Sequence, residues 1–443
     1  MIRWLHISDL HLGSAGMTTS MLRDELPVFL KQEGLKCDYV FCTGDIKTAG
    51  RADCGFSNEM ADYIRKICDA VEVDTQMLFI VPGNHDINRE ITERKSAIEK
   101  VMFRRNGYYN PDTGVISATD MADIMKGETD FKNFLAKIYS ADRAAMYGNP
   151  DRPHFNIETP HFNILHVDTT LVYSEGQEAY DLIVGTDALY KEVQKLNIEK
   201  PVILLTHYPI TSLLQDERRL LSDMLQKHEI RLWLAGHEHD HVVQRIQYID
   251  QMQAGELRRE DKANATFLIG EYDESSGNGR VIAYTWFREG WCQYPILNLD
   301  NKRKECYEFK LCKMGNDGLS LLSRAAKEAN SQYYNRLPDK VEQSLLPAID
   351  DNGRASSLET LLSETWDTAI PHLIILADGG MGKTTMLLNY CKNTSSPVLY
   401  IPAERLVTLG LGIEQFALST AMIRISFEIV FAPGIPSRHL RCS

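Results

Sequence analysis

The sequence predicts a layered α/β domain over most of its length, followed by a second, smaller unit. Apolar runs of seven or eight residues recur and end in turn residues, as expected of strands buried on both faces of a sheet. Amphipathic helical patterns separate several of them, which favours alternating strands and helices. The apolar runs lie at 2–8, 39–45, 77–83, 162–168, 201–208 and 230–236, and the clearest helical patterns at 21–34 and 58–71.

The predicted domain extends over residues 1–312. Residues 88–160 are charged and mostly helical in pattern, so we expect an inserted helical cap over one edge of the sheet. Three later runs with strand character, at 265–273, 280–287 and 306–312, would close the sheet. Residues 313–367 are polar and are predicted to form a linker to a unit that spans 368–443.

Composition is that of a soluble globular protein, with 44% hydrophobic and 25% charged residues. The net charge of −13 gives no sequence-wide attraction to nucleic acid or to an anionic membrane, although a local basic groove stays open. The nine cysteines are odd in number and form no C-x-x-C pair, which favours reduced thiols. The N-terminus has no signal-peptide pattern and no apolar run is long enough for a bilayer, so we expect a cytoplasmic protein without a membrane partner.

Five short polar motifs follow predicted strands: SDLH (8–11), GD (44–45), GNHD (83–86), TH (206–207) and GHEH (236–239). Ligands collect outside the carboxyl ends of strands in α/β sheets, so we expect all five motifs to face one site. In SDLH and GHEH the donors stand two residues apart, and in extended backbone such side chains point the same way. The candidate metal ligands are Asp9, His11, Asp45, Asn84, His207, His237 and His239.

This donor set predicts more than one metal ion. Mixed imidazole and carboxylate ligands suit manganese, iron or zinc. Seven donors exceed what one ion needs if it keeps a position open for water, whereas two ions that share one carboxylate would account for the number.

The motif order D-x-H, GD, GNH-D/E, H, G-H-x-H resembles the calcineurin-like metallophosphoesterases over roughly residues 1–300. The resemblance implies a layered metallophosphoesterase β-sandwich flanked by helices. It assigns the first ion to Asp9, His11, Asp45 and His239, and the second to Asp45, Asn84, His207 and His237, with Asp45 bridging. It also implies that His85 acts as an acid or an electrostatic stabiliser rather than as a ligand.

The expected chemistry is phosphoester hydrolysis. Two ions about 3.5–4 Å apart can bind a phosphoryl oxygen and lower the pKa of a bridging water, so that a hydroxide attacks phosphorus in line. His85, next to Asn84, is expected to stabilise or protonate the leaving oxygen, an effect worth about 10²–10⁴ in rate. Asp86 is expected to orient His85 or another histidine of the site.

One departure from the family pattern bears on the substrate. The protein Ser/Thr phosphatase branch reads GD-x-x-D-R-G, whereas this chain has Thr48 and Ala49 in the places of that aspartate and arginine. The pattern is more similar to the cyclic-nucleotide phosphodiesterase and nuclease branches, which implies a phosphodiester of a nucleotide or nucleic acid as substrate. Five other histidines of the domain are interpreted as structural: His154, His161, His166, His228 and His241. For His241, contact with the substrate is the alternative interpretation.

The stretch LADGGMGKTT (376–385) is typical of a phosphate-binding loop, with Ala377 where the strict motif has glycine. An apolar run precedes it and a helical pattern follows. Backbone amides of this loop would hold phosphates, with Lys383 at the β and γ positions and Thr384 at magnesium. The predicted nucleotide-binding residues are Gly379, Gly380, Gly382, Lys383 and Thr384, with ATP and magnesium as the ligands.

Residues 368–443 resemble the start of a NACHT or STAND-type signalling NTPase. The segment is about half of the roughly 150 residues that such a domain needs, and it shows no hydrophobic strand that ends in aspartate. The tail 431–443 has neither helical nor strand period. We therefore expect a truncated module that does not hydrolyse ATP by itself.

The leading interpretation is a binuclear, metal-dependent phosphodiesterase. The alternative is a nucleotide-sensing signalling or defence protein, in which the phosphoesterase is a latent effector, such as a nuclease, and the NTPase part mediates self-assembly.

Overall fold

The structure is a computed structural model of the chain. It describes residues 1–13, 17–48, 55–103, 109–110, 114–174, 181–246, 248–258, 265–297 and 303–311, and four short strands at 348–349, 355–356, 373–376 and 438–442. The chain divides into two compact units, Met1–Gly315 and Asn316–Ser443.

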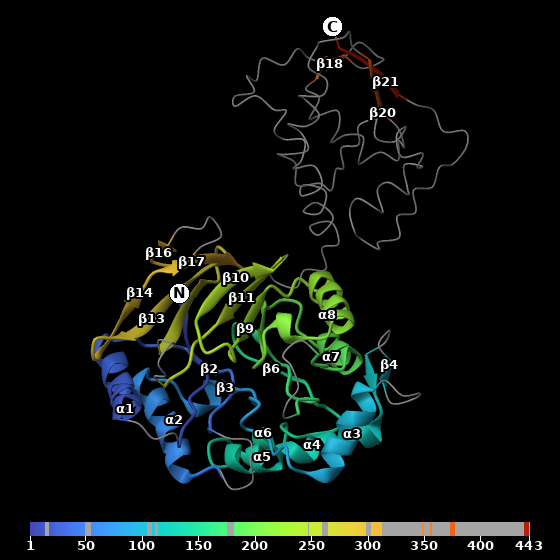
Figure 1. Cartoon of the computed structure of the whole chain (residues 1–443). Coiled ribbons are helices and arrows are strands. Elements are labelled where there is room, and N and C mark those ends of the chain that lie inside the picture. The colour runs from blue at the N-terminus through green and yellow to red at the C-terminus, as the bar shows by residue number, and fades with distance from the viewer. Residues whose placement is uncertain are drawn as a thin grey trace. The chain divides into compact units, whose positions relative to one another are not determined.

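The first unit contains a seven-stranded sheet in the order β14-β13-β12-β1-β2-β3, with β17 pairing β13 (Figure 1). Strands β1, β2 and β3 run parallel, whereas β12 joins β1 antiparallel. The parallel strands therefore end at the same edge. The strands are β1 (Ile2–Ile7), β2 (Tyr39–Cys42), β3 (Leu78–Ile80), β12 (Thr266–Asp273), β13 (Asn278–Phe287), β14 (Gly290–Tyr294) and β17 (Tyr307–Lys310).

A second sheet has six strands in the order β10-β11-β9-β8-β7-β6. Strands β7, β8, β9 and β11 are parallel, and β6 and β10 are antiparallel edge strands. The strands are β6 (Phe155–Glu158), β7 (Asn163–His166), β8 (Val202–Leu205), β9 (Leu232–Ala235), β10 (Val242–Ile246) and β11 (Ile249–Gln253). Two two-stranded ribbons complete the unit: β4 (Tyr109–Asn110) with β5 (Val115–Ile116), and β15 (Ile296–Leu297) with β16 (Arg303–Lys304).

The two sheets pack face to face and helices cover their outer faces. Trp4 and Phe41 of the first sheet share one buried cluster with Leu205 and Leu234 of the second. A second cluster joins the first sheet to α1, α2 and α5, and a third joins the second sheet to α3, α4, α7 and α8. The helices are α1 (Met17–Gln32), α2 (Asn58–Ala70), α3 (Thr92–Met102), α4 (Ala118–Met125), α5 (Thr129–Leu135), α6 (Ala141–Ala144), α7 (Thr186–Val193) and α8 (Gln215–Lys227). The mixed α/β fold expected from the sequence is thereby confirmed.

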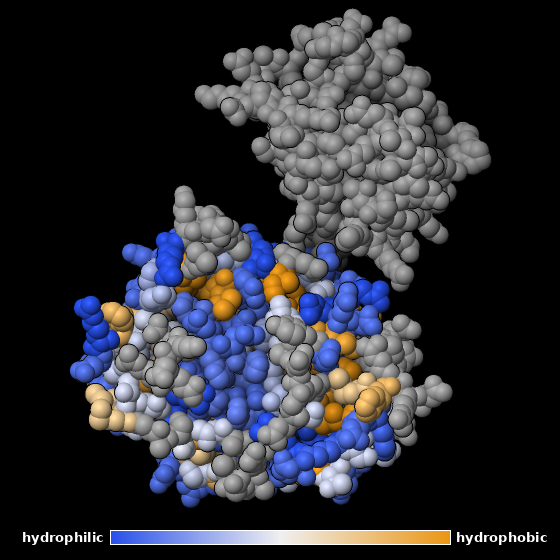
Figure 2. Space-filling model, in the orientation of Figure 1, coloured by the Kyte–Doolittle hydropathy of each residue, from blue (hydrophilic) through white to orange (hydrophobic). Residues whose placement is uncertain are grey.

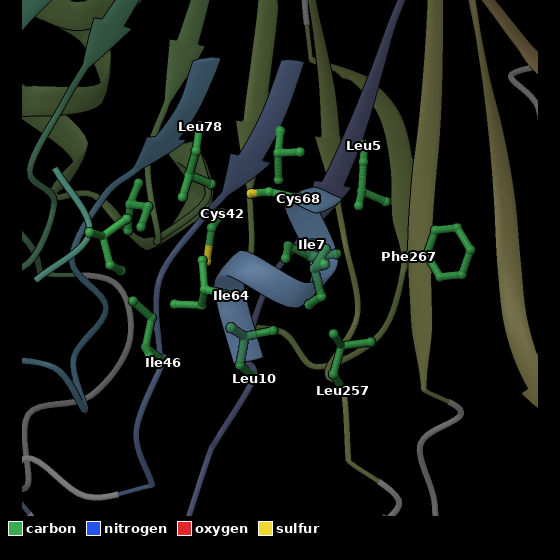
Figure 3. Close-up of a cluster of buried hydrophobic side chains, with 14 of the residues drawn as sticks. Leu5, Ile7, Leu10, Cys42, Ile46, Ile64, Cys68, Leu78, Leu257 and Phe267 are labelled. Atoms are coloured by element: carbon green, nitrogen blue, oxygen red, sulfur yellow. The ribbon is translucent and has the colours of Figure 1, made fainter. Parts of the chain in front are cut away.

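Helix α2 illustrates how the local sequence directs this packing. Ser57 caps its start, because the serine side chain accepts a hydrogen bond from the Met60 N–H at 3.3 Å. Ile64 and Cys68 stand four residues apart and therefore lie on one face of the helix. Figure 3 shows this face against Ile7 and Cys42 of the first sheet.

The expected strands and helices are found in place, but residues 88–160 are more than a cap. Phe155–Glu158 form the edge strand β6 instead of a helix. Phe131 and Phe134 of α5 are buried in the same cluster as the first sheet, so this part of the segment belongs to the core. Strands β10, β11 and β14 were not predicted, since their sequences mix polar and apolar residues without clear alternation.

The second unit contains a small sheet in the order β19-β18-β21-β20. Its strands are β18 (Ala348–Ile349), β19 (Ala355–Ser356), β20 (Leu373–Leu376) and β21 (Arg438–Cys442). Strand β20 lies in the apolar run before the glycine-rich loop, whereas the five predicted nucleotide-binding residues lie outside the described residues. The expectation of no regular element in the tail was wrong, because β21 pairs with β20 and β18.

The face of the first unit seen in Figure 2 is largely hydrophilic, with small separate hydrophobic areas. Among the described residues, the large apolar side chains that are exposed are Met1, Met17, Met21, Val28, Phe103, Val115, Tyr190, Ile198 and Phe287. Within the described parts of the chain, every helix is too short or too polar to cross a bilayer.

Candidate metal centre

The five polar motifs of the sequence lie directly after β1, β2, β3, β8 and β9. Hydrogen bonds join the loops that carry them. The Asp9 N–H donates to the Gly44 carbonyl at 3.0 Å, and the His11 N–H donates to the Asp45 carbonyl at 2.9 Å. Between the sheets, the His207 imidazole contacts the Thr43 carbonyl through Nδ1 at 2.7 Å. Residues up to 230 positions apart are thus held at one place, where the carboxyl ends of both sheets meet.

The ligand residues do not have the extended backbone that the spacing suggested. Five of them have left-handed backbone: Asp9 (φ 50°), His11 (φ 44°), Asp45 (φ 53°), His237 (φ 74°) and His239 (φ 58°). Such a conformation costs a non-glycine residue about 1–2 kcal/mol. The paired side chains therefore converge through alternating backbone turns rather than along a strand. Strain gathered at one cluster of polar residues is typical of a functional site.

Glycines allow these loops to approach closely. Gly44 has φ 98°, and a Cβ on it would lie 2.6 Å from the Gly83 nitrogen and 2.9 Å from Nδ1 of His207. Any side chain at this position would separate the loops that follow β2, β3 and β8.

The two buried carboxylates share one hydrogen-bonding pattern. Oδ2 of Asp9 accepts the His237 N–H at 3.0 Å, and Oδ1 of Asp45 accepts the His85 N–H at 2.8 Å. The other oxygen of each carboxylate is buried and has no hydrogen-bond partner among the described residues. A buried carboxylate oxygen without a donor is costly, so each of these oxygens requires a cation or a proton.

These two oxygens face histidines. Oδ1 of Asp9 lies 3.5 Å from Nε2 of His239 and 3.8 Å from Nε2 of His11. The two Nε2 atoms lie 3.4 Å apart. Asp9, His11, Asp45 and His239 each offer a ligand atom within 4.8 Å of all the others, which is the set that the family resemblance implies for the first ion.

The second predicted set converges in part. Nε2 of His207 lies 2.9 Å from Oδ1 of Asn84 and 3.5 Å from Oδ2 of Asp45. The ring of His237 lies 5.3 Å from that of His207, centroid to centroid. The Thr43 carbonyl can only accept a hydrogen bond, so Nδ1 of a neutral His207 carries the proton and Nε2 carries a lone pair. Nε2 of His207, Oδ1 of Asn84 and Oδ2 of Asp45 are then three acceptors in contact without a hydrogen between them. A cation at this place would bind all three.

The protonation states also fit metal binding. Burial, followed by the charge of Arg258 and the other site histidines, lowers the pKa of His11 to about 2. Burial, more than any neighbouring charge, lowers the pKa values of His207 and His237 to about 3. Neutral imidazole is the form that ligates metals. Burial and the nearby carboxylates Asp9 and Asp86 raise the pKa of Asp45 well above its usual range, an effect that a bound cation would oppose.

Of the two residues predicted for catalysis, His85 borders the ligand cluster and Asp86 is buried between loops. His85 is partly exposed, with Nε2 3.8 Å from Oδ2 of Asp45 and its ring 5.1 Å from that of His11, so it borders the site. Asp86 does not orient it as expected. The Asp86 carboxylate accepts the N–H groups of Gly83, Ile46 and Lys47 at 2.9–3.2 Å. It therefore fixes the loops after β2 and β3 to each other, because a buried carboxylate is satisfied best by several backbone donors.

Two groups that orient ligands were not predicted from the sequence. Nδ1 of His239 lies 3.5 Å from Oε2 of Glu256, which follows β11. The Thr43 carbonyl holds His207, as described above. Partners of this kind fix the tautomer of a ligating histidine and its ring orientation. Glu256 could have been suspected only as an acidic residue after a strand, since its neighbours form no motif.

The histidines interpreted as structural lie outside this cluster. His154 bonds to the Val184 carbonyl and to the Asp168 N–H, and His166 stacks on Phe155. The others have surface partners: His161 beside Glu274, His228 beside Gln194 and His241 against Tyr294.

Buried carboxylates and neutral imidazoles, gathered where two sheets end, define a candidate metal centre. The sequence matches the model of the calcineurin-like phosphoesterase family over residues 2–241, which is more than half of the chain. The chain belongs to this family.

One relative with a curated description is an uncharacterized metallophosphoesterase-like protein of Bacillus subtilis named YydB, which is 26% identical over 300 residues. The match covers 65% of this chain and 60% of the relative, so the chain spans less than two thirds of the protein that it matches. Similar solved structures include GAP50 of Plasmodium, at 14% identity and a TM-score of 0.37, covering 77% of this chain and 98% of that one. Vacuolar protein sorting 29 of Cryptosporidium parvum has 12% identity and a TM-score of 0.32, covering 70% and 98%.

Proposed function

We propose that this protein is a binuclear, metal-dependent phosphodiesterase that acts on a nucleotide or a nucleic acid. The observation that carries the proposal is the position of Asp45. Its buried Oδ2 has no hydrogen-bond partner in the described parts of the chain, and it lies between the first set of ligands and the His207–Asn84 pair. One carboxylate shared by two converging sets of acceptors suits two cations better than one.

The residues that would hold the ions are Asp9, His11, Asp45 and His239 for the first, and Asp45, Asn84, His207 and His237 for the second. Bound divalent ions, with manganese, iron or zinc as candidates, would supply Lewis-acid activation of a phosphoryl oxygen and of water.

The protein side chains have further roles in this proposal. His85 borders the ligand cluster and is partly exposed, so its Nε2 can reach a leaving oxygen that enters from solvent. Asp45 holds the backbone of His85 through the 2.8 Å hydrogen bond. Asp86 keeps the loop that carries Asn84 and His85 against the loop that carries Asp45. The chain thus holds an imidazole beside its metal ligands before substrate binds, where its N–H can stabilise charge on the leaving oxygen.

The preference for a diester rests on the sequence. Thr48 and Ala49 occupy the places in which the protein Ser/Thr phosphatase branch has aspartate and arginine. We therefore favour the phosphodiesterase and nuclease branches, and the net charge of −13 favours a nucleotide over a long nucleic acid.

The test is hydrolysis of bis-p-nitrophenyl phosphate with added manganese, together with the bound metal per chain measured by mass spectrometry. Asp45→Asn should lose both activity and metal, and His85→Ala should lose activity while keeping metal. His161→Ala, whose side chain lies beside Glu274 and away from the cluster, is the matched histidine control and should keep both. Equal turnover in the wild type and Asp45→Asn would refute the proposal.

A further inference from the structure

Arg89 differs from the other buried arginines beside the sheets. It lies between β3 and α3, three residues after Asp86, and only 8% of its surface is exposed. Its Nη1 is 3.5 Å from the Tyr173 hydroxyl oxygen, and its Cζ lies 5.7 Å from the Tyr173 ring centroid. Its Nε is buried without a hydrogen-bond partner, and no carboxylate of the described residues pairs with it.

Other buried arginines donate to two or more backbone carbonyls, although Nε of Arg143 also lacks a partner among the described residues. Arg94 donates to the carbonyls of Thr170, Leu171 and Tyr173 at 2.8–3.1 Å. Arg143 donates to the carbonyls of Gln76 and Leu78. These arginines stabilise loops, as their contacts show. A buried guanidinium that lacks such acceptors is unfavourable by itself and is suited to an acceptor that arrives from outside.

The surroundings of Arg89 contain a second unsatisfied donor. The Tyr208 hydroxyl is buried and has no hydrogen-bond partner within the described ranges. The ring of Tyr208 lies 5.8 Å from that of Tyr173 and 4.1 Å from that of His237, centroid to centroid. Two donors without acceptors therefore stand beside the second set of metal ligands.

Ring contacts link Arg89 to the second set of metal ligands. Its guanidinium lies over the Tyr173 ring, the Tyr173 ring neighbours that of Tyr208, and the Tyr208 ring lies 4.1 Å from that of His237. The positive charge of Arg89 is therefore on the same side of the site as His237, where it can attract an anion.

We propose that Arg89, with the hydroxyl groups of Tyr173 and Tyr208, forms an anion-binding wall that holds a phosphoryl oxygen of the substrate beside the second set of metal ligands. A guanidinium offers two donors in a fixed plane, which matches two oxygens of one phosphate. Arg89 and the two tyrosines are then substrate-binding residues. This inference rests on the proposed function for the identity of the substrate, but its test does not depend on turnover.

The first measurement is the affinity of inorganic phosphate for the manganese-loaded full chain by titration calorimetry. A charge-assisted hydrogen bond of this kind corresponds to about 10- to 100-fold in affinity, so Arg89→Met should weaken phosphate binding by that factor. Arg89→Lys, which keeps the charge but loses the planar pair of donors, should recover part of the loss. The control is Arg65→Met, which removes an arginine of α2 that contacts Asp62 and the Lys137 carbonyl; it should bind phosphate as the wild type does.

Two further readouts separate binding from a structural role. Bound metal per chain and the melting temperature should be the same in Arg89→Met and Arg65→Met. In turnover of bis-p-nitrophenyl phosphate, Arg89→Met should raise KM more than it lowers kcat. Tyr173→Phe should weaken phosphate binding by less than Arg89→Met does, because it removes the weaker donor.

The outcomes divide clearly. Weaker phosphate binding in Arg89→Met at unchanged metal content supports the anion-binding wall. If the wild type then hydrolyses none of the esters tested, only the proposed function fails. Turnover by the wild type with equal phosphate affinity in Arg89→Met would overturn the wall and leave the proposed function standing. A loss of metal in Arg89→Met, or no phosphate binding by the wild type, would also overturn it, since Arg89 would then act only as a counter-charge to the carboxylates.

Discussion

Gly83→Ala should disrupt the metal centre by steric contact alone. A Cβ on Gly83 would lie 2.1 Å from Oδ1 of Asp45 and 2.2 Å from its nitrogen. Contacts of this kind are essentially never under 3.0 Å, so the two loops must separate by about 1 Å. Asp45 cannot yield easily, because its φ is 53° and Oδ1 accepts the His85 N–H at 2.8 Å. Overpacking of this size costs about 1–3 kcal/mol, which for a unit as large as Met1–Gly315 corresponds to about 2–5 °C in melting temperature.

The assay compares Gly83→Ala with Gly290→Ala, in which the added Cβ meets no atom within 4 Å. Thermal unfolding without metal should show the loss for Gly83→Ala and little change for Gly290→Ala. Manganese titration should show affinity that is weaker by about 10–100-fold in Gly83→Ala, as expected when the orientation of a ligand is lost. Equal manganese affinity in the two variants would refute the reasoning that this close approach positions Asp45.

Three more predictions follow from the structure. Glu256→Gln should weaken metal binding by about 10–100-fold, because Glu256 lies 3.5 Å from Nδ1 of His239; Glu274→Gln, near no ligand, is the control in the same metal titration. Burial and the neighbouring Asp168 raise the pKa of Glu128 well above its usual range, so folding takes up a proton that the unfolded chain releases. The stability that this protonated carboxyl contributes is complete below the unfolded pKa of about 4.5 and is lost as pH rises toward the folded pKa. Glu128→Gln should therefore reduce the decline in the free energy of unfolding between pH 5 and 8, measured with denaturant. The same dependence on pH in the wild type and the variant would contradict the assignment. Removing residues 368–443 should leave phosphodiester turnover intact if the first unit is an autonomous enzyme, whereas lost turnover with unchanged metal content would favour a latent effector controlled by the C-terminal part.

The strands and the polar residues after them could be predicted because both leave local traces in the sequence. Runs such as 202–205 are apolar throughout, since β8 is buried on both faces. The motif residues follow these runs directly, and the rule for carboxyl ends of parallel strands then places them together. Asp9 and His239 were expected at one site on this basis, whereas their place in one ligand set came from the family resemblance; Oδ1 of Asp9 and Nε2 of His239 lie 3.5 Å apart.

The remaining features depend on contacts that no local pattern records. The left-handed backbone of His11 and His239 is imposed by the bonds between loops, so the spacing alone suggested extended chain. Asp86 was assigned to a histidine, but three backbone donors surround it once the loops have met. Glu256 comes to the site from a segment that holds no recognisable motif, and only the tertiary fold brings it there.

The left-handed backbone of the ligand residues has a consequence for how this protein would change over generations. Asp9, His11, Asp45, His237 and His239 each occupy a conformation that glycine or asparagine adopts with less strain. A lineage selected in the laboratory only for resistance to heat, with no demand on turnover, should therefore accumulate replacements at these positions early, and each would relieve about 1–2 kcal/mol of strain. The same positions should stay fixed in a parallel lineage that must keep its chemistry, so the pair of lineages would separate what the fold requires from what the activity requires.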